Sequence, residues 1–142
     1  MIETMEILKP VVMLLILSCV MLLWLYATRI PAILKLDTEL DPTLPSGTQM
    51  SQLPYRVRWK ADNYNHLLEQ PVLFYAAAIT LAVVGEGDGL NATLAWIYVG
   101  LRVVHSVFQA TVNKISVRFL LFALSSVVLI ILVVRLALVI FR

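Results

Sequence analysis

The chain has few charged residues and almost no cysteine. Asp, Glu, Lys and Arg make up 14% of its 142 residues, whereas hydrophobic residues make up 61%. A soluble domain carries about 25% charged residues, so this composition excludes an ordinary soluble protein. The net charge of +2 is too small, and the basic residues too dispersed, to favour nucleic-acid binding. The single Cys19 lies in an apolar run, which excludes a disulfide framework and a cysteine metal site.

Long apolar runs are abundant instead, and the mean hydropathy is +0.89. A membrane-spanning helix needs about 20 predominantly apolar residues. The sequence therefore predicts an all-α integral membrane protein, a four-helix bundle in a single domain over residues 1–142. The predicted spans are residues 7–33, 56–84, 91–112 and 117–141.

The connections between these spans predict how the chain is oriented. A polar segment, residues 35–54, joins the first two spans, and short turns at residues 85–89 and 113–116 join the others. Pro31 is expected to bend or end the first helix. Lys and Arg concentrate in the first and third connections and their flanks and are absent from the second. Because cytoplasmic loops are rich in Lys and Arg, both termini are predicted on the non-cytoplasmic side.

The most informative stretch is RVRWKADNYNHLLEQP, residues 56–71, which reads as a polar helix leading into the apolar second span. At about 100° per residue, four polar side chains share one face, with His66 beside them. We call this face the polar stripe; it consists of Arg58, Asp62, Asn65 and Glu69.

The third span carries a second set of polar residues on one helical face: Arg102, His105 and Gln109. A charge at the middle of a span costs at least about 2.5–3.5 kcal/mol unless it is paired or hydrated. We therefore expect this face to lie against the polar stripe, with Asp62 and Glu69 neutralising Arg102. Arg118 opens the fourth span on the same side of the membrane. Together these groups predict a pocket for a small charged ligand, reached by a second substrate from the bilayer.

Each of these residues also has a purely structural interpretation. The carboxylates and the amide of the second span can serve only to hold Arg102 between helices. A buried His105 can be a packing residue, and Arg118 can anchor the helix at the lipid headgroups. His66, Glu69 and His105 offer three metal ligands, but the arginines beside them argue against a cation. No metal is predicted.

These residues in combination resemble the MAPEG family, the membrane-associated proteins of eicosanoid and glutathione metabolism. The resemblance rests on Asn65, His66 and Glu69 before Pro71, and on Arg102-x-x-His105 followed by Arg118. It is to a bacterial-type member, which implies a multi-pass protein of the inner membrane. The family fold implies a homotrimer of four-helix subunits. Glutathione would bind between neighbouring subunits near the cytoplasmic side.

The resemblance also implies glutathione as a cosubstrate and a role for each matching residue. Glu69 would bind the glutathione amino group, and Asn65 or His66 would make the neighbouring polar contact. Arg102 and His105 would bind the carboxylates or the backbone, and Arg118 would be the catalytic residue beside the sulfur. The full set expected to bind glutathione is Arg58, Asn65, His66, Glu69, Arg102, His105 and Gln109. Two positions differ from the family pattern: Asn65-His66 replaces Arg-Asn, and Gln109 replaces a frequent tyrosine.

The expected chemistry is electrostatic activation of a thiol. A free thiol has a pKa near ~8.5, so only a few per cent is thiolate at neutral pH. The permanently charged guanidinium of Arg118 would lower this thiol pKa. The thiolate would then attack a lipophilic electrophile or reduce a lipid hydroperoxide, without a covalent enzyme intermediate. The sequence thus predicts a glutathione-dependent membrane transferase or peroxidase, with a lipophilic small-molecule substrate and membrane lipids as partners.

Two other functions fit parts of the sequence. The first is a non-catalytic lipid-binding scaffold on the same fold, which the glutamine at position 109 favours. The second is a small four-helix exporter that uses Glu69 as an intramembrane carboxylate. An exporter needs its acid deep in a span, whereas Glu69 lies near the cytoplasmic end, close to the expected position of Arg102.

Overall fold

The structure is a computed structural model that describes residues 5–142, and this part of the chain is helical with no strand. The elements in chain order are α1 (Leu8–Leu34), the 3₁₀ helix η1 (Met50–Gln52), α2 (Tyr55–Leu68), α3 (Pro71–Val83), α4 (Leu90–Thr111) and α5 (Ile115–Ile140). Together α2 and α3 cover the length of one span, so the chain has the expected four-helix layout. The helices begin and end within two residues of the predicted limits.

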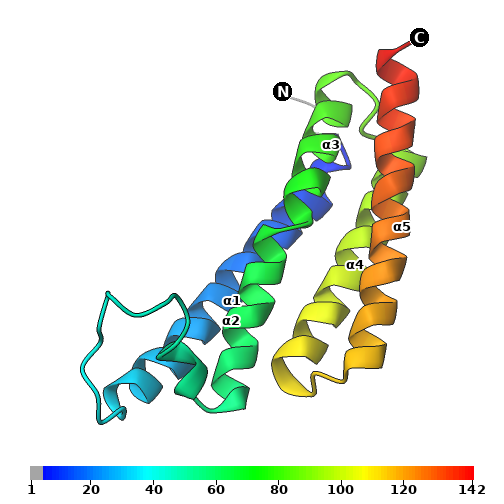
Figure 1. The fold of residues 1–142 in the computed structure, drawn as a ribbon. Coiled ribbons are helices and arrows are strands. Elements are labelled where there is room, and N and C mark those ends of the chain that lie inside the picture. The colour runs from blue at the N-terminus through cyan, green and yellow to red at the C-terminus, as the bar shows by residue number, and fades with distance from the viewer. Residues whose placement is uncertain (1–4) are drawn as a thin grey trace.

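The helices pack side by side along the length of the bundle. α4 packs against α5, and it also contacts α1 and α2 (Figure 1). The start of α1, the α3–α4 turn and the end of α5 lie together at one end of the bundle (Figure 1). The long α1–α2 connection and the α4–α5 turn lie at the other end (Figure 1). The start of α1 and the end of α5 thus lie at the same end of the bundle (Figure 1), as a layout of four successive spans predicts.

Three helical segments are long and apolar enough to cross a membrane: Leu8–Leu34, Tyr55–Val83 and Ile115–Ile140. At 22 residues, α4 has the length but is more polar than these three. Its polar residues occupy positions that the other helices cover, because Asn91, Arg102, His105, Ser106 and Gln109 are all buried. These five polar residues of α4 therefore face the other helices.

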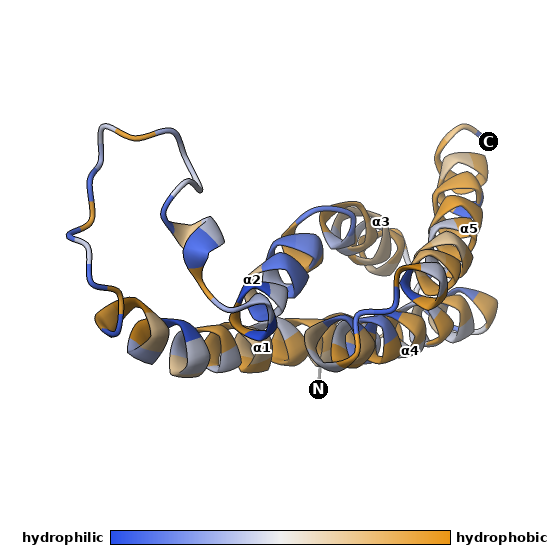
Figure 2. Cartoon of the chain, turned by 60° about the horizontal axis from the view of Figure 1, so that its bottom comes forward, coloured by the Kyte–Doolittle hydropathy of each residue, from blue (hydrophilic) through white to orange (hydrophobic). Residues whose placement is uncertain are grey.

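The predicted second span is not one continuous helix but breaks at Glu69 and Gln70, between α2 and α3. Pro71 explains the break, because its ring has no N–H and clashes with the carbonyl of Leu67 four residues earlier. As the first residue of α3, Pro71 takes a position that proline tolerates. The break also separates two compositions, since α2 is largely hydrophilic and α3 hydrophobic (Figure 2).

The side chain of Gln70 fills this break and ties it to two other helices. Its Nε2 donates a hydrogen bond of 2.6 Å to Ser126 Oγ of α5. Its Oε1 accepts a hydrogen bond of 3.2 Å from the hydroxyl of Tyr98 in α4. The ring of Tyr98 stacks on Phe74 of α3, with ring centroids 4.5 Å apart. The position of the break is thus fixed by contacts from both α4 and α5.

The α1–α2 connection begins after Leu34, within one residue of the predicted limit of the first span. α1 continues through Pro31 to Leu34, so this proline does not end the helix. The polar segment that follows is closed by the side chain of Gln49. Its Nε2 donates to the Glu39 carbonyl at 2.8 Å, and its Oε1 accepts from the Asp41 N–H at 2.8 Å.

Candidate functional site

The polar face of α4 is fully inside the bundle. Arg102, His105 and Gln109 share this face as the spacing predicts, and each is at most 1% exposed. Three further polar residues are equally buried, Asn63 in α2, Ser106 in α4 and Ser125 in α5, and sequence reasoning missed all three. The signal for Asn63 was its place one helical turn before the buried Leu67, away from the polar stripe.

Arg102 is not neutralised by Asp62 or Glu69, contrary to the sequence expectation. Among residues 5–142 the ion pairs closer than 4.0 Å are Lys9–Glu6 and His66–Glu69. Instead, Nη2 of Arg102 donates a hydrogen bond of 3.2 Å to the backbone carbonyl of His66. At the break, the His66 carbonyl loses the usual partner four residues on and accepts a hydrogen bond of 3.3 Å from the Glu69 N–H instead. A cation suits this negative end of the helix dipole. Arg102 therefore caps α2.

The polar stripe does not face α4 either. Its four residues are all exposed on the single chain. The buried face of α2 carries Asn63 and Leu67 instead. Helical spacing correctly predicts which residues share a face, but the face with unpaired charges turns outward because an apolar neighbour would leave those charges buried and unpaired.

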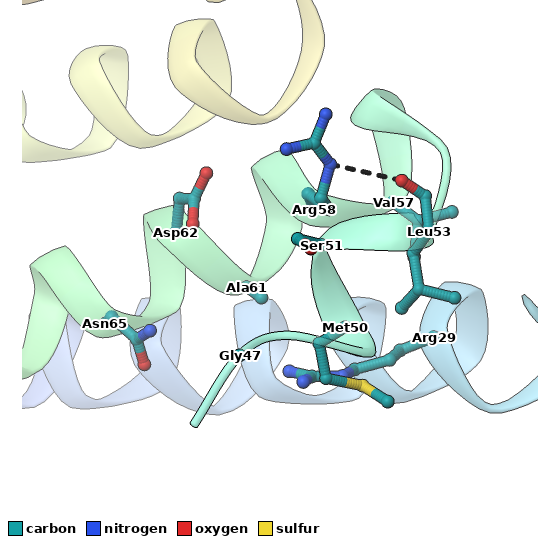
Figure 3. A pocket seen from close by; sticks show the side chains of 10 residues that line it. All are labelled: Arg29, Gly47, Met50, Ser51, Leu53, Val57, Arg58, Ala61, Asp62 and Asn65. Carbon is teal, nitrogen blue, oxygen red and sulfur yellow. Dashed lines mark hydrogen bonds between the residues drawn. The ribbon is translucent and has the colours of Figure 1, made fainter. Parts of the chain in front are cut away.

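Part of the polar stripe lines a cavity of about 310 Å³ between α1, η1 and α2. Figure 3 shows Arg58, Asp62 and Asn65 following one another along α2, with Arg29 reaching in from α1. Nε of Arg58 donates a hydrogen bond of 3.1 Å to the Leu53 carbonyl, which fixes the side chain at the edge of the cavity (Figure 3). Two guanidinium groups that form no ion pair within the described chain favour an anionic ligand group here.

A second cavity, of about 160 Å³, brings together three of the predicted site residues from three helices. It is lined by His66 of α2, His105 of α4 and Arg118 of α5, together with apolar residues of α5. The two imidazole rings have their centroids 5.7 Å apart. We call it the histidine cavity. His105 and Arg118, though distant in sequence, thus line the same cavity, whereas Arg102 does not.

Arg118 is held in place by a neutral partner. Its Nη1 donates a hydrogen bond of 2.7 Å to Oδ1 of Asn113. Asn113 has a φ of 53°, in the left-handed region that asparagine tolerates, and so forms the tight turn before α5. Because an amide carries no charge, the positive charge of Arg118 remains available to an anion in the histidine cavity.

The predicted site thus divides into three parts. Arg58 and Asn65 line the first cavity, whereas His66, His105 and Arg118 line the histidine cavity. Glu69 lies near His66, with Oε2 at 3.8 Å from Nδ1 of that ring. The remaining two predicted residues, Arg102 and Gln109, are buried between the helices. Within residues 5–142, no group of three His, Cys, Asp or Glu side chains could hold a metal ion.

Comparison with known proteins identifies the family. The family model of the MAPEG family matches residues 7–138, which is nearly the whole chain. Searches among curated proteins and among solved structures gave no match. The family match agrees with a helical bundle that has segments long and apolar enough to span a membrane. This chain belongs to the MAPEG family.

Proposed function

We propose that the protein is a glutathione-dependent membrane enzyme that activates the glutathione thiol against lipophilic electrophiles or lipid hydroperoxides. The observation that carries the proposal is the environment of Arg118. This guanidinium has no carboxylate within 4.0 Å in the described chain, and it lines a cavity with two imidazoles. An uncompensated cation beside a bound thiol stabilises the thiolate and so lowers the thiol pKa, at about 1.4 kcal/mol per unit.

Glutathione suits the groups of the polar stripe. It carries two carboxylates and one ammonium group. Arg58 and Asn65 offer hydrogen-bond donors for a carboxylate, and the exposed carboxylate of Glu69 suits the ammonium group. The buried Arg102, Gln109 and Asn63 support the helices that present these groups rather than touching the exposed ligand themselves.

The polar stripe also supports the homotrimer as part of the proposal. It lies on a segment long and apolar enough to span a membrane, and its charges are exposed on the single chain. Charged groups facing lipid are costly, so a second copy of the chain or an aqueous ligand must cover them. A glutathione site between neighbouring copies, in the cytoplasmic half of the membrane, would meet both needs. Native mass spectrometry should then give three times the 16.0 kDa chain mass, and a glutathione-binding monomer would contradict this.

Turnover of 1-chloro-2,4-dinitrobenzene and of cumene hydroperoxide with glutathione tests the proposal. We expect Arg118→Ala to lower kcat by about 10²-fold or more for both acceptors, because it removes the electrostatic stabilisation of the thiolate. Arg118→Lys should retain part of the activity, since it keeps the charge but not the planar fork. Arg142→Ala, at the other end of α5, is the matched control. Full activity in Arg118→Ala would refute the mechanism.

A second function, lipid binding without catalysis, is favoured by a groove on the α1 side of the bundle. This groove has a volume of about 410 Å³ and an almost entirely apolar lining: Met5, Leu8, Lys9, Val12, Met13, Ile16 and Trp96. An apolar groove of this kind suits a fatty acyl chain, whereas the ammonium group of Lys9 is already paired with the carboxylate of Glu6 at 2.7 Å. Lipid copurifying with a wild-type protein that shows no glutathione-dependent turnover would favour this function over the enzymatic one.

A further inference from the structure

Two basic residues of α2 lie outside the proposed glutathione site. Arg56 and Lys60 are one helical turn apart, on the side of α2 opposite the polar stripe. Arg56 is exposed and Lys60 is partly buried, and neither has a carboxylate within 4.0 Å in residues 5–142. Like charges four residues apart on a helix repel each other. An anionic group that bridges the two side chains would remove this repulsion.

The ammonium group of Lys60 is held between α2 and α1. Its Nζ donates a hydrogen bond of 2.9 Å to the Arg56 carbonyl and lies 5.1 Å from the ring centroid of Trp24 in α1. An ammonium group has three donors, so donors remain for an anion. Tyr55 and Trp59 of α2 pack together nearby in the chain, with ring centroids 4.9 Å apart. Because Trp and Tyr gather at the headgroup level of a membrane, this end of α2 suits that level.

An apolar strip runs from Trp24 along the outer side of α1. Val20, Ile16 and Met13 lie within about 80° of Trp24 around this helix. Their side chains are 51%, 54% and 45% exposed on the single chain. Ile16 and Met13 also line the apolar groove between α1 and Trp96 of α4, at the end of the groove nearest to Trp24. The basic pair on α2 and the groove are therefore joined by apolar surface.

The length of this strip matches the depth of one leaflet. At a rise of about 1.5 Å per residue, Trp24 lies about 12 Å from Ile16 and about 16 Å from Met13 along α1. The hydrocarbon core of a bilayer is about 30 Å thick, so the acyl chains of one leaflet extend about 15 Å from the headgroup level. An acyl chain that starts at the level of Trp24 thus ends in the groove.

We propose that Arg56 and Lys60 bind the phosphate of an anionic phospholipid, one of whose acyl chains lies along α1 and enters the groove. This inference goes beyond the proposed enzymatic function and does not depend on it. The direction of the lipid follows from charge, because Lys9 at the far end of the groove is paired with Glu6, whereas Arg56 and Lys60 form no ion pair within the described chain. A zwitterionic phospholipid would bring its own cation to the two basic side chains, so the site favours lipids with a net negative charge.

Quenching of tryptophan fluorescence by brominated lipids tests the inference on the wild-type protein. Trp24 lies at the proposed headgroup and Trp96 at the groove. Protein in detergent micelles would be titrated with phosphatidylglycerol or phosphatidylcholine, both brominated at the same acyl carbons. We expect half-maximal quenching at an about tenfold lower mole fraction of phosphatidylglycerol, because each Lys or Arg near an anionic lipid contributes about fivefold. Equal curves for the two lipids would overturn the inference.

Soluble glycerol phosphate, added as a competitor, separates a lipid site from a phosphate site. We expect it to leave the quenching by brominated phosphatidylglycerol unchanged, since it has no acyl chain to enter the groove. Reversal of the quenching by glycerol phosphate at the concentration of the lipid would overturn the assignment to a lipid.

The double variant Arg56→Gln/Lys60→Gln tests the position of the headgroup. We expect it to lose most of the preference for phosphatidylglycerol and to keep the wild-type curve for phosphatidylcholine. Arg142→Gln, which removes an exposed arginine at the other end of the bundle, is the matched control and should keep the preference. A preference that survives in the double variant would overturn the inference, whether or not the protein turns over glutathione.

Discussion

Arg102 and Arg118 are both predicted as site residues, but they have different surroundings in this protein. Arg102 is fully buried, and its Nε and Nη1 have no hydrogen-bond partner, while Nη2 caps the end of α2. Arg118 is partly exposed, is oriented by Asn113, and lines a cavity. A guanidinium that already satisfies a helix end is a structural group, whereas one with a free charge at a cavity can act on a ligand.

Replacing Arg102 tests this structural role. Arg102→Ala should lower the thermal midpoint in detergent by several degrees, because a large-to-small change in a packed core costs about 2–5 kcal/mol. Arg102→Met should cost much less, since an apolar side chain of similar length removes a buried charge that has no carboxylate partner. Tryptophan fluorescence during heating, with wild type beside both variants, measures the midpoints. Equal losses in the two variants would show that the charge, not the volume, is what the fold needs.

Among the helices, the break between α2 and α3 has the clearest consequences for the site. The polar helix ends at Leu68, where the His66 carbonyl accepts hydrogen bonds from both the Glu69 N–H and Arg102. The break also places Gln70 between Tyr98 and Ser126. The polar stripe and the histidine cavity both depend on where α2 ends.

Pro71→Ala should make the helix more continuous between α2 and α3. Alanine supplies an N–H that can bond the Leu67 carbonyl, so amide exchange around residues 70–72 should slow. Glutathione turnover should fall at the same time, because a longer α2 would shift Glu69 and His66. Hydrogen–deuterium exchange measured by mass spectrometry gives the first result and an activity assay the second. Unchanged exchange and activity would mean that Gln70, rather than the proline, determines the break.

The turn before α4 holds the start of α1 by close backbone packing. The N–H of Ile7 donates to the Gly87 carbonyl at 2.9 Å, and the N–H of Glu6 donates to Asp88 Oδ1 at 2.8 Å. A Cβ at Gly87 would lie 2.7 Å from Cγ2 of Ile7 and 2.8 Å from Cβ of Met5. Only glycine allows this approach.

Gly87→Ala should therefore displace the start of α1 and destabilise the protein by about 1–3 kcal/mol. Gly100→Ala is the matched control, because a Cβ there meets nothing within 4 Å and a helix interior favours alanine by about 0.5–1 kcal/mol. Thermal midpoints should thus move in opposite directions. A midpoint for Gly87→Ala equal to that of wild type would contradict the close packing.

For the whole molecule, composition and periodicity were enough to predict four helices and the buried polar face of α4. They were not enough to predict which surfaces meet. Helical spacing places Asp62 and Glu69 on one face but says nothing about the neighbour of that face, which depends on how all the helices pack. The cap by Arg102 was not predicted either, because its partner is a backbone carbonyl at the end of α2. A pattern of side chains does not show which backbone carbonyl will accept a hydrogen bond from a distant residue.

The measurement that tests the central claim most directly is isothermal titration of glutathione into the detergent-purified protein. The account predicts saturable binding by wild type and by Glu86→Gln, a matched change in the α3–α4 turn at the other end of the bundle. Glu69→Gln should lose at least about tenfold in affinity, because an amide replaces the charged partner of the ammonium group. Arg118→Ala should still bind but should lack the thiolate absorbance seen with wild type. No binding by wild type, or unchanged binding by Glu69→Gln, would contradict the account.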